Sequence, residues 1–190
     1  PRPIPVGHRG ASGERPENTL PAFERALEHG ARILETDVHP SRDGVPVIFH
    51  DPTLARTTDG EGPIAARSLA ELKALDAGHR FSPDGASFPW RGRGVTIPTL
   101  EEAFEAFPDA RFNIEIKQGD EAFIGRVLDL VRAGGREERT LLAAAGDDTM
   151  AVVRRVVAAH GSQVAIGACT GDCIAFVKAA TQGSGPPPEP

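Results

Sequence analysis

The chain has 190 residues, of which 39% are hydrophobic and 25% are charged, values typical of a globular protein with a buried core. Its formal net charge of −6 argues against electrostatic binding of nucleic acid or of an anionic membrane surface. The sequence contains no apolar run of the ~20 residues that a membrane-spanning helix needs, and it shows no signal peptide. We therefore expect a cytoplasmic protein.

The first half of the chain predicts three strands, one well-marked helix and a long irregular segment. Residues 4–9 form the first predicted strand. A helix then begins near the capping residues Asn18 and Thr19 and ends at Gly30. The segments that follow are a strand at 31–39, a turn at Asp43-Gly44, a strand at 45–50 and a loop-rich stretch at about 52–98.

Helices and strands alternate in the rest of the chain. Capping boxes at residues 68–71, within the loop-rich stretch, and at 99–102, just after it, each predict a short helix. Apolar and polar side chains alternate along residues 111–117, which is typical of a strand with one buried face. The later segments are a helix at 121–133, a strand at 140–145, a helix at 148–160, a strand at 163–169, a helix at 172–181 and an extended or disordered tail at 182–190.

This alternation implies a parallel α/β sheet, either an open doubly wound sheet or a (β/α)8 barrel. The first predicted strand–helix turn has no G-x-G-x-x-G motif, which argues against a dinucleotide-binding doubly wound sheet. A barrel usually has ~250 residues and eight strands, whereas six strands are predicted here. We expect one domain over residues 1–181 and, if it is a barrel, one that lacks its last two strands.

Polar side chains gather at four predicted strand ends. In chain order they are His8 and Arg9, Glu35 and Asp37, His50 and Asp51, and Glu115 and Lys117. The C-terminal ends of parallel strands form the active-site rim of α/β proteins, so we expect these side chains to meet. Each pair alone is more typical of an exposed face or a weak surface ion pair than of a site. Their occurrence at four strand ends is what indicates a site.

The residue types at these ends suit a metal and a phosphate. The carboxylates of Glu35, Asp37 and Glu115 would repel one another unless a cation lay among them, and an all-oxygen set favours Mg²⁺ or Ca²⁺ over zinc. Arg9 offers a fork-shaped donor and Lys117 a compact positive charge, both of which suit a phosphate group.

Two histidines complete the candidate site. His8 and His50 carry the side chain whose ordinary pKa lies nearest neutrality, as an acid–base pair requires. Together with a metal and a cationic phosphate site, they indicate phosphodiester cleavage. His39, on the same predicted face as Asp37, is a candidate for a supporting role. Three further histidines are assigned no chemistry: His29, His79 and His160.

Nine short motifs occur in the order found in one known family. They are His8-Arg-Gly, Pro16-Glu-Asn-Thr19, Glu35-Thr-Asp37, Asp43-Gly44, His50-Asp51, Arg56-Thr-Thr58, Leu75-Asp-Ala-Gly78, Ile97-Pro-Thr-Leu-Glu-Glu102 and Asn113-Ile-Glu-Ile-Lys117. With these motifs the chain resembles the glycerophosphodiester phosphodiesterase family, closely over about residues 4–117 and more loosely to about residue 180.

The resemblance implies a TIM-type (β/α)8 barrel with a small insertion after the third strand, at about residues 52–98. It also implies metal-dependent hydrolysis of glycerophosphodiesters, such as glycerophosphocholine or glycerophosphoethanolamine, to sn-glycerol 3-phosphate and an alcohol. The residues that match by position are Glu35, Asp37 and Glu115 for one divalent cation, His8 and His50 for the acid–base pair, and Arg9 and Lys117 for the phosphate. Glu17 matches a glutamate of the first loop, which either touches the metal-bound substrate or braces the loop.

Two other functions stay open on the sequence alone. One is a lysophospholipase-D-like or phosphatidylinositol-specific phospholipase on a similar barrel. The other is a non-catalytic binding module on a truncated barrel, for which the absent late strands are the argument. The retained histidines and acidic residues favour an enzyme. The sequence does not fix the alcohol, the cation, the division of acid and base between the histidines, or the oligomeric state.

Overall fold

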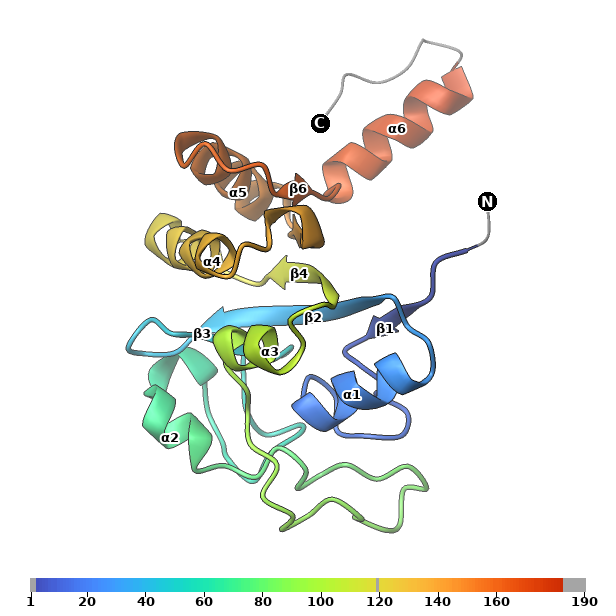
Figure 1. Cartoon of the computed structure of the whole chain (residues 1–190), viewed down its shortest axis with the longest axis vertical. Helices are drawn as coiled ribbons and strands as arrows, with labels where there is room; N and C mark the ends of the chain where they lie inside the picture. Colours follow the sequence, from blue (N-terminus) through green and yellow to red (C-terminus); the bar gives the residue numbers. More distant parts are fainter. Residues whose placement is uncertain (1–2, 119, 183–190) are drawn as a thin grey trace.

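The computed structural model describes residues 3–118 and 120–182 and contains one six-stranded sheet (Figure 1). Its strands are β1 (Val6–His8), β2 (Ile33–Pro40), β3 (Pro46–Ile48), β4 (Arg111–Ile116), β5 (Thr140–Ala143) and β6 (Ala165–Ile166). The α-helices are α1 (Leu20–Glu28), α2 (Leu69–Lys73), α3 (Leu100–Ala106), α4 (Glu121–Ala133), α5 (Asp147–Ala159) and α6 (Thr170–Gln182). Two short 3₁₀ helices, η1 (Ile64–Ala66) and η2 (Glu137–Arg139), complete the set.

Local sequence signals account for several helix starts. Both predicted capping boxes form: Ser68 and Glu71 exchange hydrogen bonds at the start of α2, and Thr99 and Glu102 do so at the start of α3. The side chain of Asp120 accepts hydrogen bonds from the first backbone N–H groups of α4. These caps satisfy donors that a helix end leaves unpaired.

Strand β3 departs from the prediction of a purely parallel sheet. It pairs antiparallel with the last residues of β2, whereas β1, β2, β4, β5 and β6 pair in parallel in that order. The reason lies in the short connection, because a parallel crossover needs about a dozen residues or more. A tight turn at Gly44 (φ +77°) instead reverses the chain. The strand then returns along β2, where the Phe49 N–H donates to the Asp37 carbonyl at 3.0 Å, and places His50 near the same rim.

The five parallel strands form the predicted α/β arrangement, open between β1 and β6 in the part of the chain that the structure describes. Because β3 lies off this parallel path, an eight-stranded barrel would need three more parallel strands rather than the predicted two. Strand β6 is also shorter than predicted.

The main core lies between the parallel strands and the helices. Along β4, Phe112, Ile114 and Ile116 are buried, while the alternate side chains are exposed or half-buried, so the predicted alternation is confirmed. Phe112 packs edge-to-face against Phe23 of α1 and Phe104 of α3, with ring centroids 6.2 and 5.3 Å apart. Such pairs add about 0.5–1.5 kcal/mol to the free energy gained by burial.

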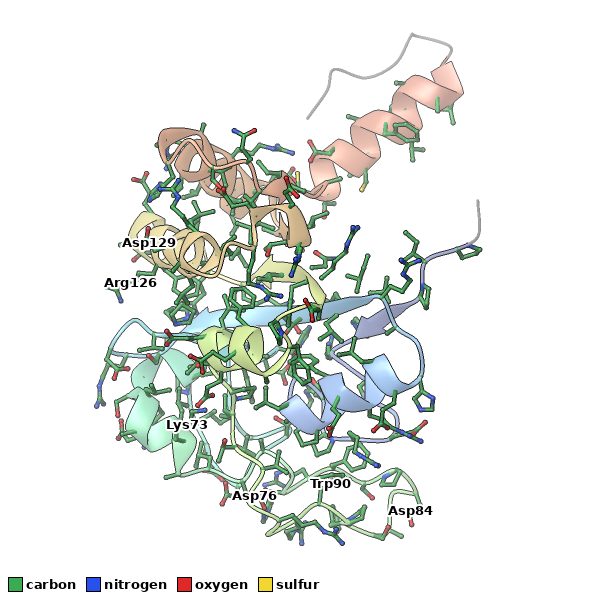
Figure 2. All side chains as sticks on the ribbon, viewed as in Figure 1. Lys73, Asp76, Asp84, Trp90, Arg126 and Asp129 are labelled. Atoms are coloured by element: carbon green, nitrogen blue, oxygen red, sulfur yellow. The ribbon has the colours of Figure 1, made fainter. Side chains whose placement is uncertain are left out.

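The stretch at 52–98, predicted as an insertion, has a small core of its own. Leu54, Ile64 and Leu72 are fully buried there and pack in one cluster with Val47 of β3. The Trp90 ring, in the long loops of this segment (Figure 2), lies 5.0 Å from the guanidinium carbon of Arg15 in the loop between β1 and α1. The segment is therefore joined both to β3 and to the first loop.

Helix α6 extends away from the sheet (Figure 1), and three of its apolar side chains are half exposed or more: Ile174, Phe176 and Val177. The predicted tail at 182–190 lies outside the described residues except for the last residue of this helix. None of the described helices combines the length and apolar character needed to cross a bilayer.

Candidate active site

Neighbouring strands bring the predicted metal-ligating carboxylates together. In the sheet register, His8 of β1 lies opposite Glu35 of β2, and Asp37 of β2 lies opposite Glu115 of β4. Potential ligand oxygens of Glu35, Asp37 and Glu115 lie within 4.8 Å of one another. Within residues 3–118 and 120–182, they are the one group of three His, Cys, Asp or Glu side chains close enough to hold a metal ion together.

The ammonium group of Lys117 lies between two of these carboxylates. Its Nζ is 2.9 Å from Asp37 Oδ1 and donates to Glu115 Oε1 at 2.7 Å. Burial lowers the pKa of Lys117, but the hydrogen bonds to Glu115 and Asp37 outweigh this effect, so the net pKa is raised. The carboxylate cluster therefore already accommodates a positive charge.

Glu35 is less well compensated. The Nε2 atom of His8 lies 3.9 Å from its Oε2, which also accepts a hydrogen bond from the backbone N–H of Arg9 at 3.1 Å. Burial and the negative charge of Asp37 raise the pKa of Glu35. The three carboxylates hold only one ammonium group, and the raised pKa of Glu35 shows that its negative charge is still disfavoured. A hard divalent cation such as Mg²⁺ or Ca²⁺ fits such a cluster.

Arg9 combines a strained backbone with an incompletely paired side chain. Its φ of +55° is uncommon for a residue other than glycine. Its guanidinium donates to Glu17 Oε1 at 3.1 Å, and its Nε lies 3.6 Å from Asp37 Oδ2. That Nε is buried and has no hydrogen-bond partner among the described residues. Backbone strain and an unpaired buried donor in one residue are typical of a functional position.

Asn18 holds Asp37 in place, a role that sequence reasoning missed. Its Nδ2 donates to Asp37 Oδ2 at 2.9 Å, and its Oδ1 accepts from the Thr36 hydroxyl at 2.8 Å. The prediction treated Asn18 as half of a helix cap, but Thr19 alone is the N-cap residue. The φ of Asn18 is +57°, in the left-handed region that asparagine tolerates better than most residues.

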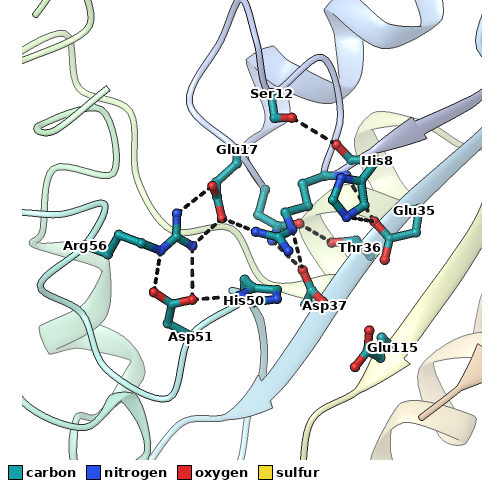
Figure 3. Close-up of polar contacts among 12 residues, drawn as sticks. His8, Ser12, Glu17, Glu35, Thr36, Asp37, His50, Asp51, Arg56 and Glu115 are labelled. Carbon is teal, nitrogen blue, oxygen red and sulfur yellow. Dashed lines mark hydrogen bonds and ion pairs between the residues drawn. The ribbon is translucent and has the colours of Figure 1, made fainter. Parts of the chain in front are cut away.

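A chain of hydrogen bonds links His50 to Arg9 (Figure 3). His50 Nδ1 lies 2.6 Å from Asp51 Oδ1, and Arg56 Nε donates to Asp51 Oδ2 at 2.5 Å. The terminal nitrogens of Arg56 donate to the two Glu17 oxygens at 2.6 and 2.8 Å, and Glu17 in turn accepts from Arg9. One predicted phosphate-binding residue, Arg9, and one predicted acid–base residue, His50, thus belong to one network.

This network also contains two residues to which the sequence prediction gave no role. Asp51 and Arg56 both belong to the nine motifs that carry the family resemblance, and this membership is the sequence signal that could have identified them. Burial raises the pKa of Glu17, but hydrogen bonds and charges from Arg56 and Arg9 outweigh it and lower the net pKa. Glu17 is therefore held as an anion between two guanidinium groups.

The Asp51→Asn variant should lose part of the acid sensitivity of the fold. The hydrogen bond from Arg56 is the main cause that lowers the pKa of Asp51 to about 2 from an ordinary 3.8. A carboxyl group whose pKa is lower in the folded than in the unfolded state stabilises the fold at pH values above the unfolded-state pKa. That stabilisation is lost as the pH falls through the folded-state pKa. Between about pH 4 and pH 2, the wild-type free energy of unfolding should therefore decrease more steeply than that of Asp51→Asn.

Urea denaturation at several pH values measures this difference. Asp109→Asn is the matched control, because Asp109 is nearly fully exposed and lies outside the network; it should keep the wild-type slope. Identical slopes for the wild type and Asp51→Asn would contradict the prediction.

The remaining polar candidates lie beside the site or away from it. His39 is buried, its Nε2 lies 3.0 Å from the carbonyl oxygen of His50, and burial lowers its pKa. This contact agrees with a supporting role. His29 instead pairs with Glu14 at the surface, and the ring of His160 contacts a backbone carbonyl of α5.

Comparison with known sequences identifies the family of the chain. A sequence profile of the "Glycerophosphoryl diester phosphodiesterase family" matches residues 8–160. A glycerophosphodiester phosphodiesterase from Caldanaerobacter subterraneus is 42% identical over 142 residues, which are 72% of this chain and 56% of that protein. The chain spans about half the length of the curated relatives it matches.

Comparison with solved structures agrees. The glycerophosphoryl diester phosphodiesterase domain of an uncharacterized protein from Mycobacterium tuberculosis superposes with a TM-score of 0.87 at 26% identity, covering 100% of this chain and 68% of that one. An Oleispira antarctica phosphodiesterase in complex with the product sn-glycerol-3-phosphate gives a TM-score of 0.70 at 36% identity, covering 80% of this chain and 62% of that one. These similarities confirm the predicted α/β barrel-type fold.

Proposed function

Because the chain belongs to the glycerophosphoryl diester phosphodiesterase family, we propose that it hydrolyses glycerophosphodiesters to sn-glycerol 3-phosphate and an alcohol with the help of one divalent cation. The observation that carries this proposal is the carboxylate cluster of Glu35, Asp37 and Glu115, within 4.8 Å of one another and beside His8. The relative crystallised with sn-glycerol-3-phosphate supports the product class.

In this proposal the three carboxylates hold Mg²⁺ or Ca²⁺. When bound, the cation supplies Lewis-acid stabilisation of the phosphoryl oxygens and lowers the pKa of a hydroxyl group that it contacts. Arg9 and Lys117 bind the phosphate, Arg9 with a guanidinium whose Nε makes no hydrogen bond within the described residues and Lys117 from its place next to the cluster. Asn18 fixes the orientation of Asp37, as hydrogen-bonded neighbours of metal ligands commonly do.

The two histidines move protons. One accepts the proton of the attacking oxygen, from a glycerol hydroxyl or from water, as that oxygen forms a bond to phosphorus. The other gives a proton to the oxygen of the departing alcohol as the bond from phosphorus to that oxygen breaks. Asp51 holds Nδ1 of His50, which leaves Nε2 as the atom that exchanges the proton. Glu17 acts as a brace between Arg9 and Arg56 rather than as a metal ligand.

We also propose that residues 1–181 work as one catalytic domain, with 52–98 as its insertion. Arg56, which comes from this insertion, reaches Asp51 and Glu17 at the site. The insertion therefore contributes to the geometry of the site.

The direct test is hydrolysis of glycerophosphocholine, followed by release of glycerol 3-phosphate, with added Mg²⁺ or Ca²⁺ and with excess chelator. We expect turnover with at least one cation and its loss in chelator, restored when the cation is returned, because the three carboxylates alone supply no Lewis acid. Chelator-insensitive turnover would contradict the metal assignment.

The same assay separates the alternatives. Hydrolysis of lysophosphatidylcholine to choline in preference to glycerophosphocholine would indicate the lysophospholipase-D-like alternative. Binding of either diester without any turnover would indicate a non-catalytic module.

A further inference from the structure

A cavity of about 350 Å³ lies between the first loop and the insertion, next to the candidate active site. Its lining includes Ser12 and Glu17 from the loop between β1 and α1, and Arg56, Arg80, Phe81 and Ser82 from the insertion. Glu17 and Arg56 also belong to the network that ends at His50, so the cavity and the site share a wall. Its volume falls at the lower end of the ~300–1,000 Å³ typical of small-molecule sites.

The charges on the shared wall are balanced. Glu17 and Arg56 line the cavity and pair with each other, and their further partners, Arg9 and Asp51, carry one charge of each sign. Arg80 adds a positive charge beyond this balance, because no carboxylate of the described chain lies within ion-pair distance of it. Its Nε donates to the Thr58 carbonyl at 3.1 Å, which anchors the side chain. Its two terminal nitrogens make no hydrogen bond within the described residues, so their donors are left for another partner.

The same lining is poorly suited to a quaternary ammonium group. Proteins recognise such groups with several aromatic faces arranged as a cage. Phe81 is the one aromatic side chain among the residues that line this cavity, and the guanidinium of Arg80, which also lines it, would repel a cation. Hydroxyl groups of Ser12 and Ser82 make the rest of the lining polar.

We propose that this cavity receives the alcohol half of the diester and that Arg80 makes it selective for alcohols that carry an anionic group over alcohols that carry a quaternary ammonium. The inference rests on the proposed function, which places the phosphodiester at the adjoining carboxylates and histidines. Arg80 then acts as a specificity-determining residue and takes no part in the chemical step.

The test compares kcat/KM for three diesters: glycerophosphoinositol 4-phosphate, glycerophosphoinositol and glycerophosphocholine. The wild type should prefer the anionic probe to the choline probe by about tenfold or more, the size expected for one charge-assisted hydrogen bond. Arg80→Met should bring this ratio close to one, and Arg80→Glu should invert it. The wild-type preference should also weaken as ionic strength rises, because a partly exposed charge pair is screened.

Arg91→Met is the matched control. Arg91 lies in the same insertion and also donates its Nε to a backbone carbonyl, that of His79, at 2.9 Å, but it does not line the cavity. It should leave the ratio unchanged. An equal change of the ratio in Arg91→Met and Arg80→Met would overturn the proposal, because the effect would then come from the general charge of the insertion. A wild type that turns over all three probes equally would overturn it as well.

A second measurement separates this proposal from the proposed function. Calorimetric titration of the three diesters into the His8→Ala variant, with the cation present, measures affinity without turnover. Tighter binding of the anionic probe by His8→Ala, and loss of this preference in the double variant that also carries Arg80→Met, would support the subsite. This holds even if the wild type hydrolysed none of the probes. That absence of hydrolysis would count against the proposed function alone. Equal affinity for all three probes would overturn the subsite.

Discussion

Replacing His8 or His50 with alanine is expected to lower kcat about 10²–10⁴-fold, the range typical of a lost general acid or base. The expected cost in stability is small. The His8 side chain is 68% exposed, and exposed substitutions usually change the free energy of unfolding by less than about 0.5 kcal/mol. His50 loses one hydrogen bond, to Asp51, worth about 1 kcal/mol, while Arg56 still holds Asp51.

The measurement pairs the rate of glycerol 3-phosphate release at saturating substrate with urea denaturation of each variant. His29→Ala is the control, because His29 is a half-exposed histidine that pairs with Glu14 outside the site. It should keep wild-type kcat. A variant of His8 or His50 that folds and turns over at nearly the wild-type rate would remove that histidine from the mechanism.

Replacing Asp37 with asparagine is expected to abolish cation binding and to lower turnover strongly. Asp37 is nearly fully buried and lies in the middle of the cluster, opposite Glu115 and within reach of Lys117, Asn18 and Arg9. The substitution keeps the shape of the side chain but removes its charge. Since Lewis-acid stabilisation is worth several kcal/mol, kcat should fall at least ~10²-fold.

Thermal unfolding with and without the cation provides a readout that does not depend on activity. At a cation concentration 100 times its Kd, binding stabilises the folded wild type by about 2.7 kcal/mol, which raises its Tm. Asp37→Asn should show no such increase. Because a buried substitution can itself destabilise the fold, Glu115→Gln, at a half-buried position, serves as a second variant with the same expected loss. Full cation-dependent stabilisation in both variants would refute the metal assignment.

The sequence predicted those parts of the site that depend on local pattern and strand pairing. Glu35 and Asp37 share a strand face, and Glu115 follows two residues after Asn113 on the next parallel strand, so alternation and register together bring the carboxylates close. Both capping boxes also formed as predicted, because each depends on residues three apart in the chain.

The parts that sequence reasoning missed depend on contacts between distant segments. Arg56 reaches Glu17 across 39 residues, and no periodicity encodes that contact. Asn18 was taken for a cap because its side chain could equally serve a helix end or a neighbouring strand, and only the folded chain decides between them. Helix–strand alternation elsewhere favours a parallel sheet, whereas β3 runs antiparallel because the short turn at Gly44 leaves no room for a parallel crossover.

The ion pairs of the site have a consequence for the order in which ligands bind. The carboxylates at the site are those of Glu17, Glu35, Asp37, Asp51 and Glu115, and the fixed cations facing them are those of Arg9, Arg56 and Lys117. If both histidines are neutral and every carboxyl group is ionised, the five carboxylates exceed the three fixed cations by two negative charges. One divalent ion would balance this excess. Without such an ion, we expect an anionic diester to meet a repulsive field at these carboxylates. Under the proposed function we therefore expect cation and substrate binding to strengthen each other, with the cation adding first.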